Sequence, residues 1–250
     1  MNLQNKVAII TGAGSGIGRA TALKFAKDGA KVVVAEFNDV TGPETVDLIK
    51  KEGGEAVFKK VNVGEFKEVE EVVQFTVDTY GTIDVIFNNA GIGINKPLLE
   101  HTPEDYDAVV KINQYGVYYG ILAAARKMKE LGVHGTIVNT ASVFAFMASH
   151  GVIGYHAAKG AVKMMTQSAA LELAPYNIRV VAVAPGGVDT RIIQGYKDAG
   201  LTEHLSRQQM TGKLMQPEQI ANVVAFLASE EASGINGSVV MVDDGFASFK

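Results

Sequence analysis

Three residues have the types and spacing needed to make a catalytic base from a phenol: Tyr155, Lys159 and Ser142. Tyrosine normally has a pKa near ~10, and a nearby ammonium favours the phenolate and lowers that pKa. The segment 154–172 has helical composition, and residues four apart on a helix share a face. We therefore expect Tyr155 and Lys159 to point into the same space, with Tyr155 in the first helical turn, where the helix dipole favours negative charge. A tyrosine and a lysine at this spacing also occur by chance on helix surfaces, so the rest of the chain decides the interpretation.

A glycine-rich turn joins a predicted strand to a predicted helix near residue 11. Residues 6–11 (KVAIIT) form a short apolar run, residues 11–18 are TGAGSGIG, and helical periodicity follows. Glycines let the backbone approach a pyrophosphate, and the free amides and dipole of a helix N-terminus attract it. The turn therefore predicts a phosphate cradle, although its spacing is GxxxGxG and not the commoner GxGxxG.

Further motifs follow in order along the chain: NNAG at 88–91, Asn113, Ser142, Tyr155-x-x-x-Lys159 and Pro185-Gly186. With the glycine turn, they have the order and spacings of the short-chain dehydrogenase/reductase family, which this sequence resembles over essentially its whole length. The resemblance implies hydride exchange between an alcohol carbon and a nicotinamide cofactor. It also implies a single domain with a doubly wound, Rossmann-type α/β fold.

The resemblance implies a role for each member of a catalytic tetrad. Tyr155 would be the base in alcohol oxidation and the acid in ketone reduction. Lys159 would lower the tyrosine pKa and hold the nicotinamide ribose, and Ser142 would donate a hydrogen bond to the substrate oxygen. Asn113 would hold a water that links Lys159 to solvent.

Cofactor contacts are expected along the ends of the predicted strands. Asn62-Val63 occupies the place where relatives commonly carry Asp-Val beside the adenine. The expected positions are Gly12, Ser15, Gly16, Ile17, Gly18, Glu36, Asn62, Val63, Asn89, Ala90, Gly91, Tyr155, Lys159, Pro185, Gly186, Val188 and Thr190.

The residues near the predicted adenosine site favour NAD over NADP. Glu36 ends the second apolar run, about twenty residues after the glycine turn, where a carboxylate can accept bonds from both ribose hydroxyls and repel a 2′-phosphate. Ser15 stands where NADP-using relatives often carry a basic residue. Two alternatives remain: a 3-oxoacyl-(acyl-carrier-protein) reductase, which would favour NADPH, and a non-catalytic nucleotide-binding sensor of the same fold.

The expected substrate is a neutral, fairly apolar secondary alcohol or its ketone. We expect its pocket to be lined by Phe144, Phe146, Met147, Val152, Ile192, Ile193 and Tyr196. The polar, glycine-interrupted segment 189–214 is predicted to be a lid over the substrate, because long connections in compact domains often have that role. His150 is either a substrate contact or a surface residue, and Asp244 replaces a glycine common in relatives.

Short apolar runs alternate with helical patterns and predict a parallel sheet covered on both faces. The predicted strands are 7–10, 31–35, 56–59, 85–87, 136–139, 179–184 and 238–242. The predicted helices are 17–28, 42–52, 66–80, 104–131, 155–174 and 217–229. No linker or repeat divides the chain, so we expect one domain over residues 1–250 with a seven-stranded sheet.

Composition narrows the class of protein. The chain has 250 residues, 47% hydrophobic content, a net charge of −4 and no cysteine. These values favour a soluble cytoplasmic protein that binds neither nucleic acid nor membrane, and the five histidines lack the spacing of a metal site. We also expect a homotetramer, because helices 104–131 and 155–174 carry apolar residues on more than one face: Val117, Ile121, Leu122, Val162, Met165 and Ala169.

Overall fold

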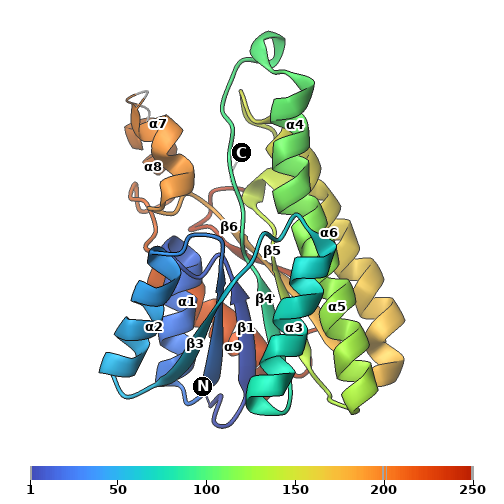
Figure 1. Ribbon diagram of the computed structural model, residues 1–250. Helices are drawn as coiled ribbons and strands as arrows, with labels where there is room; N and C mark the ends of the chain where they lie inside the picture. The colour runs from blue at the N-terminus through green and yellow to red at the C-terminus, as the bar shows by residue number, and fades with distance from the viewer. Residues whose placement is uncertain (1, 199, 201, 249–250) are drawn as a thin grey trace.

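Seven parallel strands form one sheet in the order β3-β2-β1-β4-β5-β6-β7 (Figure 1). This computed structural model describes residues 2–198, 200 and 202–248. The strands are β1 Val7–Thr11, β2 Lys31–Glu36, β3 Glu55–Lys60, β4 Val85–Asn88, β5 Thr136–Thr140, β6 Arg179–Pro185 and β7 Val239–Val242. The chain winds outward from β1 to β3 and then returns to β4 on the other side of β1. The predicted seven-stranded, doubly wound Rossmann-type sheet is confirmed.

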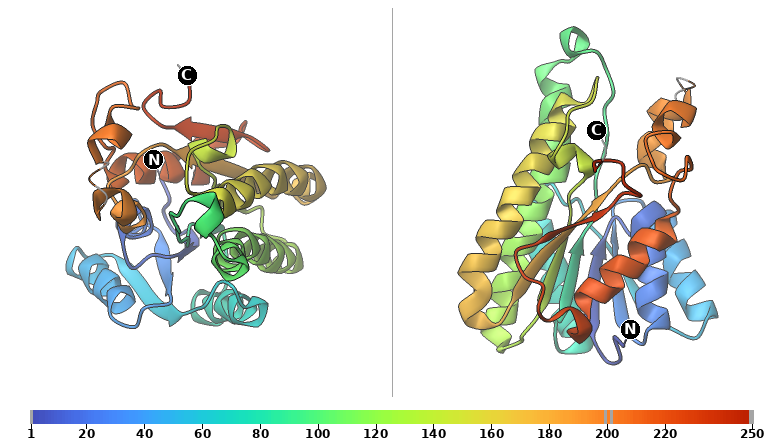
Figure 2. Two further views of the ribbon diagram at one scale, coloured as in Figure 1. Left: turned by 90° about the horizontal axis from the view of Figure 1, so that it is seen from above. Right: turned by 180° about the vertical axis from the view of Figure 1, so that it is seen from behind.

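Helices cover both faces of the sheet. They are α1 Gly16–Lys27, α2 Thr41–Lys51, α3 Phe66–Tyr80, α4 Pro103–Val110, α5 Gly116–Leu131, α6 Ile153–Leu173, α7 Gln194–Asp198, α8 Thr202–Ser206 and α9 Pro217–Ala228. Figures 1 and 2 show α1, α2 and α9 on one face and α3, α5 and α6 on the other. Side chains alternate along each strand, so Ile10 belongs to the core under α1 and Ile9 to the core under α5. Burial on both faces explains the continuous apolar runs.

One expectation about the helices needs correction. The helix predicted over 104–131 is interrupted by a π-helical turn, Lys111–Tyr115, which separates α4 from α5. A π-helical turn is a rare single turn with α-helix on both sides, and the helical composition of the flanking residues gave no sign of it. The segment 189–214 contains two short helices, α7 and α8, which rise above the sheet opposite α4 (Figure 1).

The six apolar residues expected on more than one face of α5 and α6 differ in burial. Val117, Ile121 and Val162 are buried against the sheet, and the three others are partly buried: Leu122, Met165 and Ala169. The two helices pack against each other as well as against the sheet. The exposed large apolar residues of the two helices are Tyr118, Leu131, Ile153, Met164 and Leu171. Among the described helices, none combines the length and apolar character that crossing a membrane requires.

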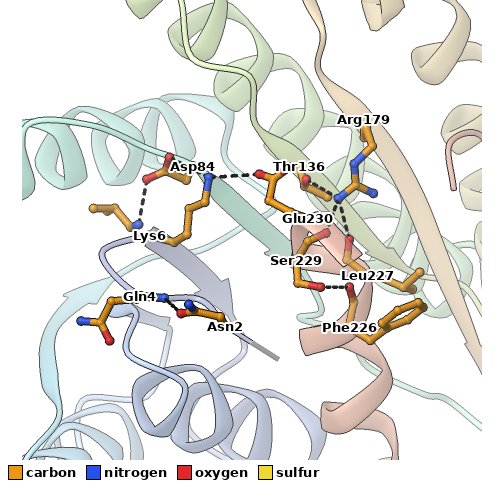
Figure 3. A network of polar contacts seen from close by, with 11 residues as sticks. Asn2, Gln4, Lys6, Asp84, Thr136, Arg179, Phe226, Leu227, Ser229 and Glu230 are labelled. Carbon is orange, nitrogen blue, oxygen red and sulfur yellow. Dashed lines mark hydrogen bonds and ion pairs between the residues drawn. The ribbon is translucent and has the colours of Figure 1, made fainter. Parts of the chain in front are cut away.

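A network of charged groups ties the amino ends of the strands to the end of α9 (Figure 3). The Arg179 guanidinium donates to the Thr136 hydroxyl at 3.0 Å and to the carbonyls of Leu227, Ser229 and Ile235 at 2.9 to 3.1 Å. The Lys6 ammonium lies 3.8 Å from the Asp84 carboxylate and 3.4 Å from that of Glu230. The charges at this end of the sheet therefore have polar partners within the chain.

Candidate active site

A cleft of about 730 Å³ runs along the carboxyl ends of the strands. In a doubly wound sheet, this is the edge where ligands bind, at the point where the strand order reverses. The structure brings every predicted cofactor position except Gly18 to the lining of this cleft. Gly18 packs α1 against the glycine turn, because an ideal Cβ there would lie 2.1 Å from the Gly12 carbonyl oxygen.

The glycine turn has a geometry that larger residues would block. Gly12 has φ +65°, and an ideal Cβ on it would lie 2.8 Å from the Ala90 Cα. Gly16 has φ +51°, and its Cβ would lie 3.0 Å from the Thr190 Cγ2 across the cleft. The absence of these β-carbons opens the cradle and exposes the start of α1, so the residues present fit a dinucleotide pyrophosphate.

Thr11 fixes the turn to the NNAG segment. Its hydroxyl oxygen accepts from the amides of Asn89 at 2.9 Å and Ala90 at 3.1 Å, and its carbonyl accepts from the Asn89 side chain at 3.0 Å. These hydrogen bonds between the ends of β1 and β4 therefore fix the part of the cleft lining that lies between the two strands.

Glu36 lies at the end of β2 with its carboxylate held by backbone donors. One oxygen accepts from the Gly14 amide at 2.9 Å, and the other accepts from the amides of Phe37 at 2.9 Å and Asn38 at 3.1 Å. The nearby cations are paired elsewhere: Arg19 binds Glu44 and Lys60 binds Asp39. A fixed negative charge therefore lines this part of the cleft.

Ser142, Tyr155 and Lys159 meet where the strand end of β5 faces the first turns of α6. The Ser142 hydroxyl oxygen accepts from the Phe144 amide at 3.1 Å, which leaves its hydroxyl proton available to a ligand. The Lys159 Nζ lies 5.4 Å from the centroid of the Tyr155 ring. Tyr155 is in the first turn of α6, and the expectation that the two side chains share one space is met.

Lys159 is almost completely buried, and this burial lowers its pKa to about 7. Its ammonium donates to the Thr140 carbonyl at 2.7 Å and forms no ion pair with a carboxylate among the described residues. The Thr140 hydroxyl is also buried at the cleft and has no described hydrogen-bond partner. The Lys159 ammonium and the Thr140 hydroxyl therefore still have hydrogen bonds to offer to a ligand at this end of the sheet.

Asn113 lies in the π-helical turn and outside the cleft lining. Its side-chain oxygen accepts from the Ile92 amide and its side-chain nitrogen donates to the Ile92 carbonyl, both at 2.8 Å. This reciprocal pair holds the loop after β4, whose residues Ile92 and Gly93 line the cleft. The structure therefore gives Asn113 a contact that positions this loop, and its role in holding a water stays a prediction.

A smaller chamber of about 160 Å³ adjoins the large cleft. Its walls include four of the predicted substrate residues: Phe144, Val152, Ile192 and Ile193. Phe146 and Met147 are not part of the lining, and the side chain of Tyr196 lies outside the described structure. His150 is exposed and is also absent from the lining. The sequence analysis missed Asn95, Leu205 and Phe246, because only the folded chain brings these distant segments to the chamber.

The described residues contain no group of three or more histidine, aspartate or glutamate side chains placed to hold a metal ion.

Comparison with known proteins places the chain in a family. A family model described as Enoyl-(Acyl carrier protein) reductase matches residues 12–247. The chain is 39% identical over 245 residues to cyclohexanol dehydrogenase of Acinetobacter sp., covering 98% of this chain and 96% of that protein. It is also 39% identical over 249 residues to the 3-oxoacyl-(acyl-carrier-protein) reductase of Thermotoga maritima, covering 98% of this chain and 99% of that protein.

Comparison with solved structures points to the same family. A short-chain type dehydrogenase/reductase from Mycobacterium marinum superposes with a TM-score of 0.95 at 32% identity, covering 99% of this chain and 97% of that one. A candidate 2-deoxy-d-gluconate 3-dehydrogenase from Agrobacterium tumefaciens with bound NADP superposes with a TM-score of 0.90 at 30% identity, covering 98% and 97%. Since sequence and structure match along nearly their whole lengths, this chain belongs to the short-chain dehydrogenase/reductase family.

Proposed function

We propose that the protein is an NAD(H)-dependent oxidoreductase that interconverts a neutral, fairly apolar secondary alcohol and its ketone. One observation carries the proposal: Ser142 and Tyr155 line both the large cleft and the small chamber. They therefore stand where a cofactor in the first cavity would meet a substrate in the second. The similarity to cyclohexanol dehydrogenase supports the same reaction class.

The proposed mechanism assigns a separate task to each side chain. Nicotinamide, when bound, supplies the hydride acceptor in oxidation and the donor in reduction. Tyr155 removes the alcohol proton as the carbon–hydrogen bond breaks, and in reduction it returns that proton to the ketone oxygen. The Ser142 hydroxyl, fixed by the Phe144 amide, donates to the same oxygen and stabilises the negative charge that develops there.

Lys159 would act with Tyr155 as a coupled pair. Burial disfavours the ammonium, whereas a phenolate forming nearby favours it, so the proton affinities of the two groups depend on each other. Loss of the tyrosine proton therefore strengthens the hold of Lys159 on its own proton. Asn113 would support the site by fixing the loop at Ile92 and, as expected from the family, by holding a water linked to Lys159.

The chamber supports a compact substrate. An apolar cavity of about 150 Å³ is known to accept benzene, so the chamber of about 160 Å³ has room for a six-membered ring. Its side-chain walls are mainly aliphatic and aromatic, with Asn95, Ser142 and Tyr155 as the polar exceptions. The absence of charged side chains from this lining favours a neutral substrate over a carboxylate or phosphate.

NAD is the proposed cofactor because the fixed Glu36 carboxylate would repel the 2′-phosphate of NADP. Its three backbone bonds also prevent it from turning away without leaving amides unpaired. The family includes a structure with bound NADP, so the preference must be tested directly. Comparing kcat/KM for NAD and for NADP in cyclohexanol oxidation, followed by absorbance, decides it, and equal or better use of NADP would overturn the assignment.

A 3-oxoacyl-(acyl-carrier-protein) reductase is the second candidate, favoured by the similarity to the Thermotoga maritima enzyme. A 3-oxoacyl thioester with NADPH provides the discriminating assay. Faster reduction of this thioester than of cyclohexanone would favour the second candidate. A nucleotide-binding sensor would bind NADH and turn over neither substrate; the presence of Asn113, Ser142, Tyr155 and Lys159 argues against it.

The proposal extends to the whole chain as one domain, with 189–214 as a lid over the substrate. Thr190 lies against Gly16, and Ile193 packs with Val143 and Leu205, so the segment is already connected to the site at these residues. Hydrogen exchange in the described part of this segment should slow when NADH and a substrate analogue bind. Exchange that is slow without ligand and unchanged by it would make the segment a fixed wall.

We also propose a cytoplasmic homotetramer that assembles through α5 and α6. The exposed Tyr118, Met164 and Leu171 give these helices apolar outer faces that a symmetric partner would cover. Light scattering at micromolar concentration tests the assembly, and a monomeric mass would contradict it.

A further inference from the structure

Phe246 forms a wall of the substrate chamber from a turn that follows β7. Its ring is buried and contacts the Phe144 ring edge-on, with centroids 6.1 Å apart. Phe144 in turn contacts the Tyr155 ring edge-on at 6.4 Å. Three aromatic rings therefore connect the turn after β7 to the phenol at the catalytic position, and a shift of Phe246 would change the space beside Tyr155.

The turn that delivers Phe246 is held by two adjacent aspartates. The Asp243 carboxylate is buried and accepts from the amides of Gly245 at 3.3 Å and Ala247 at 2.8 Å. Asp244 has φ +48° and Gly245 has φ +74°, so the chain takes two successive left-handed residues. A residue with a side chain rarely adopts this conformation without a compensating contact.

The compensating contact of Asp244 is with the end of the proposed lid. One carboxylate oxygen accepts from both the amide of Thr211 at 2.9 Å and its hydroxyl at 2.7 Å. The Asp244 carbonyl accepts from the Met210 amide at 2.8 Å. The bonds from the Thr211 hydroxyl and the Thr211 amide hold the pKa of the Asp244 carboxyl below its usual range, so it stays charged at neutral pH. We call this set of three hydrogen bonds the Asp244 latch.

The latch joins parts of the molecule that share a small core of their own. Val143, Ile193, Leu205 and Phe246 form a buried cluster separate from the two cores that cover the sheet. Ile193 and Leu205 come from the 189–214 segment, and all three of Ile193, Leu205 and Phe246 line the chamber. The Asp244 latch therefore lies where the 189–214 segment meets the turn that carries Phe246.

We infer that the Asp244 latch fixes Phe246 and thereby sets the largest substrate that the chamber accepts. Phe246 is the specificity-determining residue, and Asp244 is a positioning residue that acts through it. This inference rests on the proposed oxidation of a secondary alcohol. A glycine at 244 would take the same backbone conformation without strain but could not bind Thr211, so replacement there loosens the latch without blocking the turn.

The test compares cyclohexanol with the bulkier 4-tert-butylcyclohexanol, using kcat/KM for each in the full-length protein. Phe246→Ala should raise the preference for the bulky alcohol about tenfold relative to the unchanged protein. Asp244→Gly should raise it about threefold, in the same direction, because the wall is loosened and not removed. Asp244→Asn keeps an oxygen acceptor and tolerates the left-handed conformation, so it should retain the original preference.

Hydrogen exchange at Met210 and Thr211 measures the latch without using activity. Exchange there should accelerate in Asp244→Gly and remain near its original rate in Asp244→Asn. A purely structural role would lower kcat/KM for both alcohols equally and leave the preference unchanged, which would overturn the inference. Unchanged exchange in Asp244→Gly would likewise overturn the latch. If the unchanged protein oxidises neither alcohol while exchange responds as expected, the proposed function fails and the latch stands as a structural element without a substrate role.

Discussion

Each end of the sheet carries a cation shielded from solvent, the half-buried Arg179 at one end and the buried Lys159 at the other, but the two cations have different surroundings. At the amino ends, the Arg179 guanidinium donates to a hydroxyl and to carbonyls at the end of α9 (Figure 3). At the carboxyl ends, the Lys159 ammonium has one backbone carbonyl as its hydrogen-bond acceptor and no described carboxylate nearby. Burial without a counter-charge destabilises the ammonium and leaves it responsive to a ligand.

The difference separates the residues that stabilise the fold from those that perform chemistry. Breaking the Arg179 network should cost stability and spare the reaction, because the network is far from the cleft lining. Changing Tyr155 or Lys159 should cost the reaction and spare or even increase stability, since functional sites often hold groups that the fold alone would not favour. The following predictions test this separation, from the largest expected effect to the smallest.

Tyr155→Phe removes the oxygen that exchanges a proton with the substrate and little side-chain volume. Turnover of cyclohexanol with NAD should fall by about 10³-fold or more, because general acid–base catalysis contributes up to about 10⁴-fold. NADH affinity, measured by fluorescence titration, should stay near its original value. Tyr176→Phe provides the matched control, because Tyr176 is on the surface, where its hydroxyl accepts from Lys129. Near-normal turnover in Tyr155→Phe would eliminate the mechanism.

Arg179→Met should lower the free energy of unfolding by about 2 kcal/mol, because it leaves several carbonyls at the end of α9 without a charged donor. Urea denaturation at pH 7 measures this loss. Lys6→Met, which breaks partly exposed ion pairs at the same end, should cost less than about 1 kcal/mol. Activity per folded molecule should be unchanged in both variants. A large loss of turnover in Arg179→Met would show that the two ends are not independent.

Glu36→Gln keeps the side-chain shape and removes the charge that would repel a 2′-phosphate. The preference for NAD over NADP, measured as a ratio of kcat/KM values, should fall about tenfold, which corresponds to about 1.4 kcal/mol. Glu52→Gln, at the exposed end of α2, is a control that should leave the ratio unchanged. An unaltered ratio in Glu36→Gln would remove the electrostatic basis of the proposed NAD preference.

The sheet and the cradle could be predicted from sequence because both depend on local patterns. Each strand is a short apolar run, such as residues 7–10, that ends within a residue or two of its predicted limit. The glycine turn can be recognised in the sequence because it needs residues that permit positive φ, such as Gly12 and Gly16. The helical spacing of Tyr155 and Lys159 is equally local, and it places both at the cleft.

Other features of the site depend on contacts between distant segments. The turn after β7 places Phe246 at the chamber, and no sequence pattern near residue 246 predicts this position. The sequence identified Asp244 as a departure from relatives, but its partner Thr211 lies 33 residues away. The π-helical turn at Asn113 was not predicted because it is a single turn inside a long segment of helical composition.

The separation between the two ends is tested most directly by the pH dependence of stability in Lys159→Met. In the unfolded chain Lys159 keeps its proton up to a pH of about 10.4, whereas burial lowers its pKa in the folded protein to about 7. Between these values the unfolded state binds more protons, so the stability of the unchanged protein should rise with pH, by up to about 1.4 kcal/mol per pH unit from this group.

The measurement is urea denaturation of the unchanged protein and of Lys159→Met, without cofactor, at several pH values from 6 to 9. We predict that Lys159→Met is the more stable protein at pH 6, that its advantage shrinks as the pH rises, and that it fails to oxidise cyclohexanol. A variant that is less stable than the unchanged protein by the same amount at every pH would contradict the account, because Lys159 would then be a stabilising residue like Arg179.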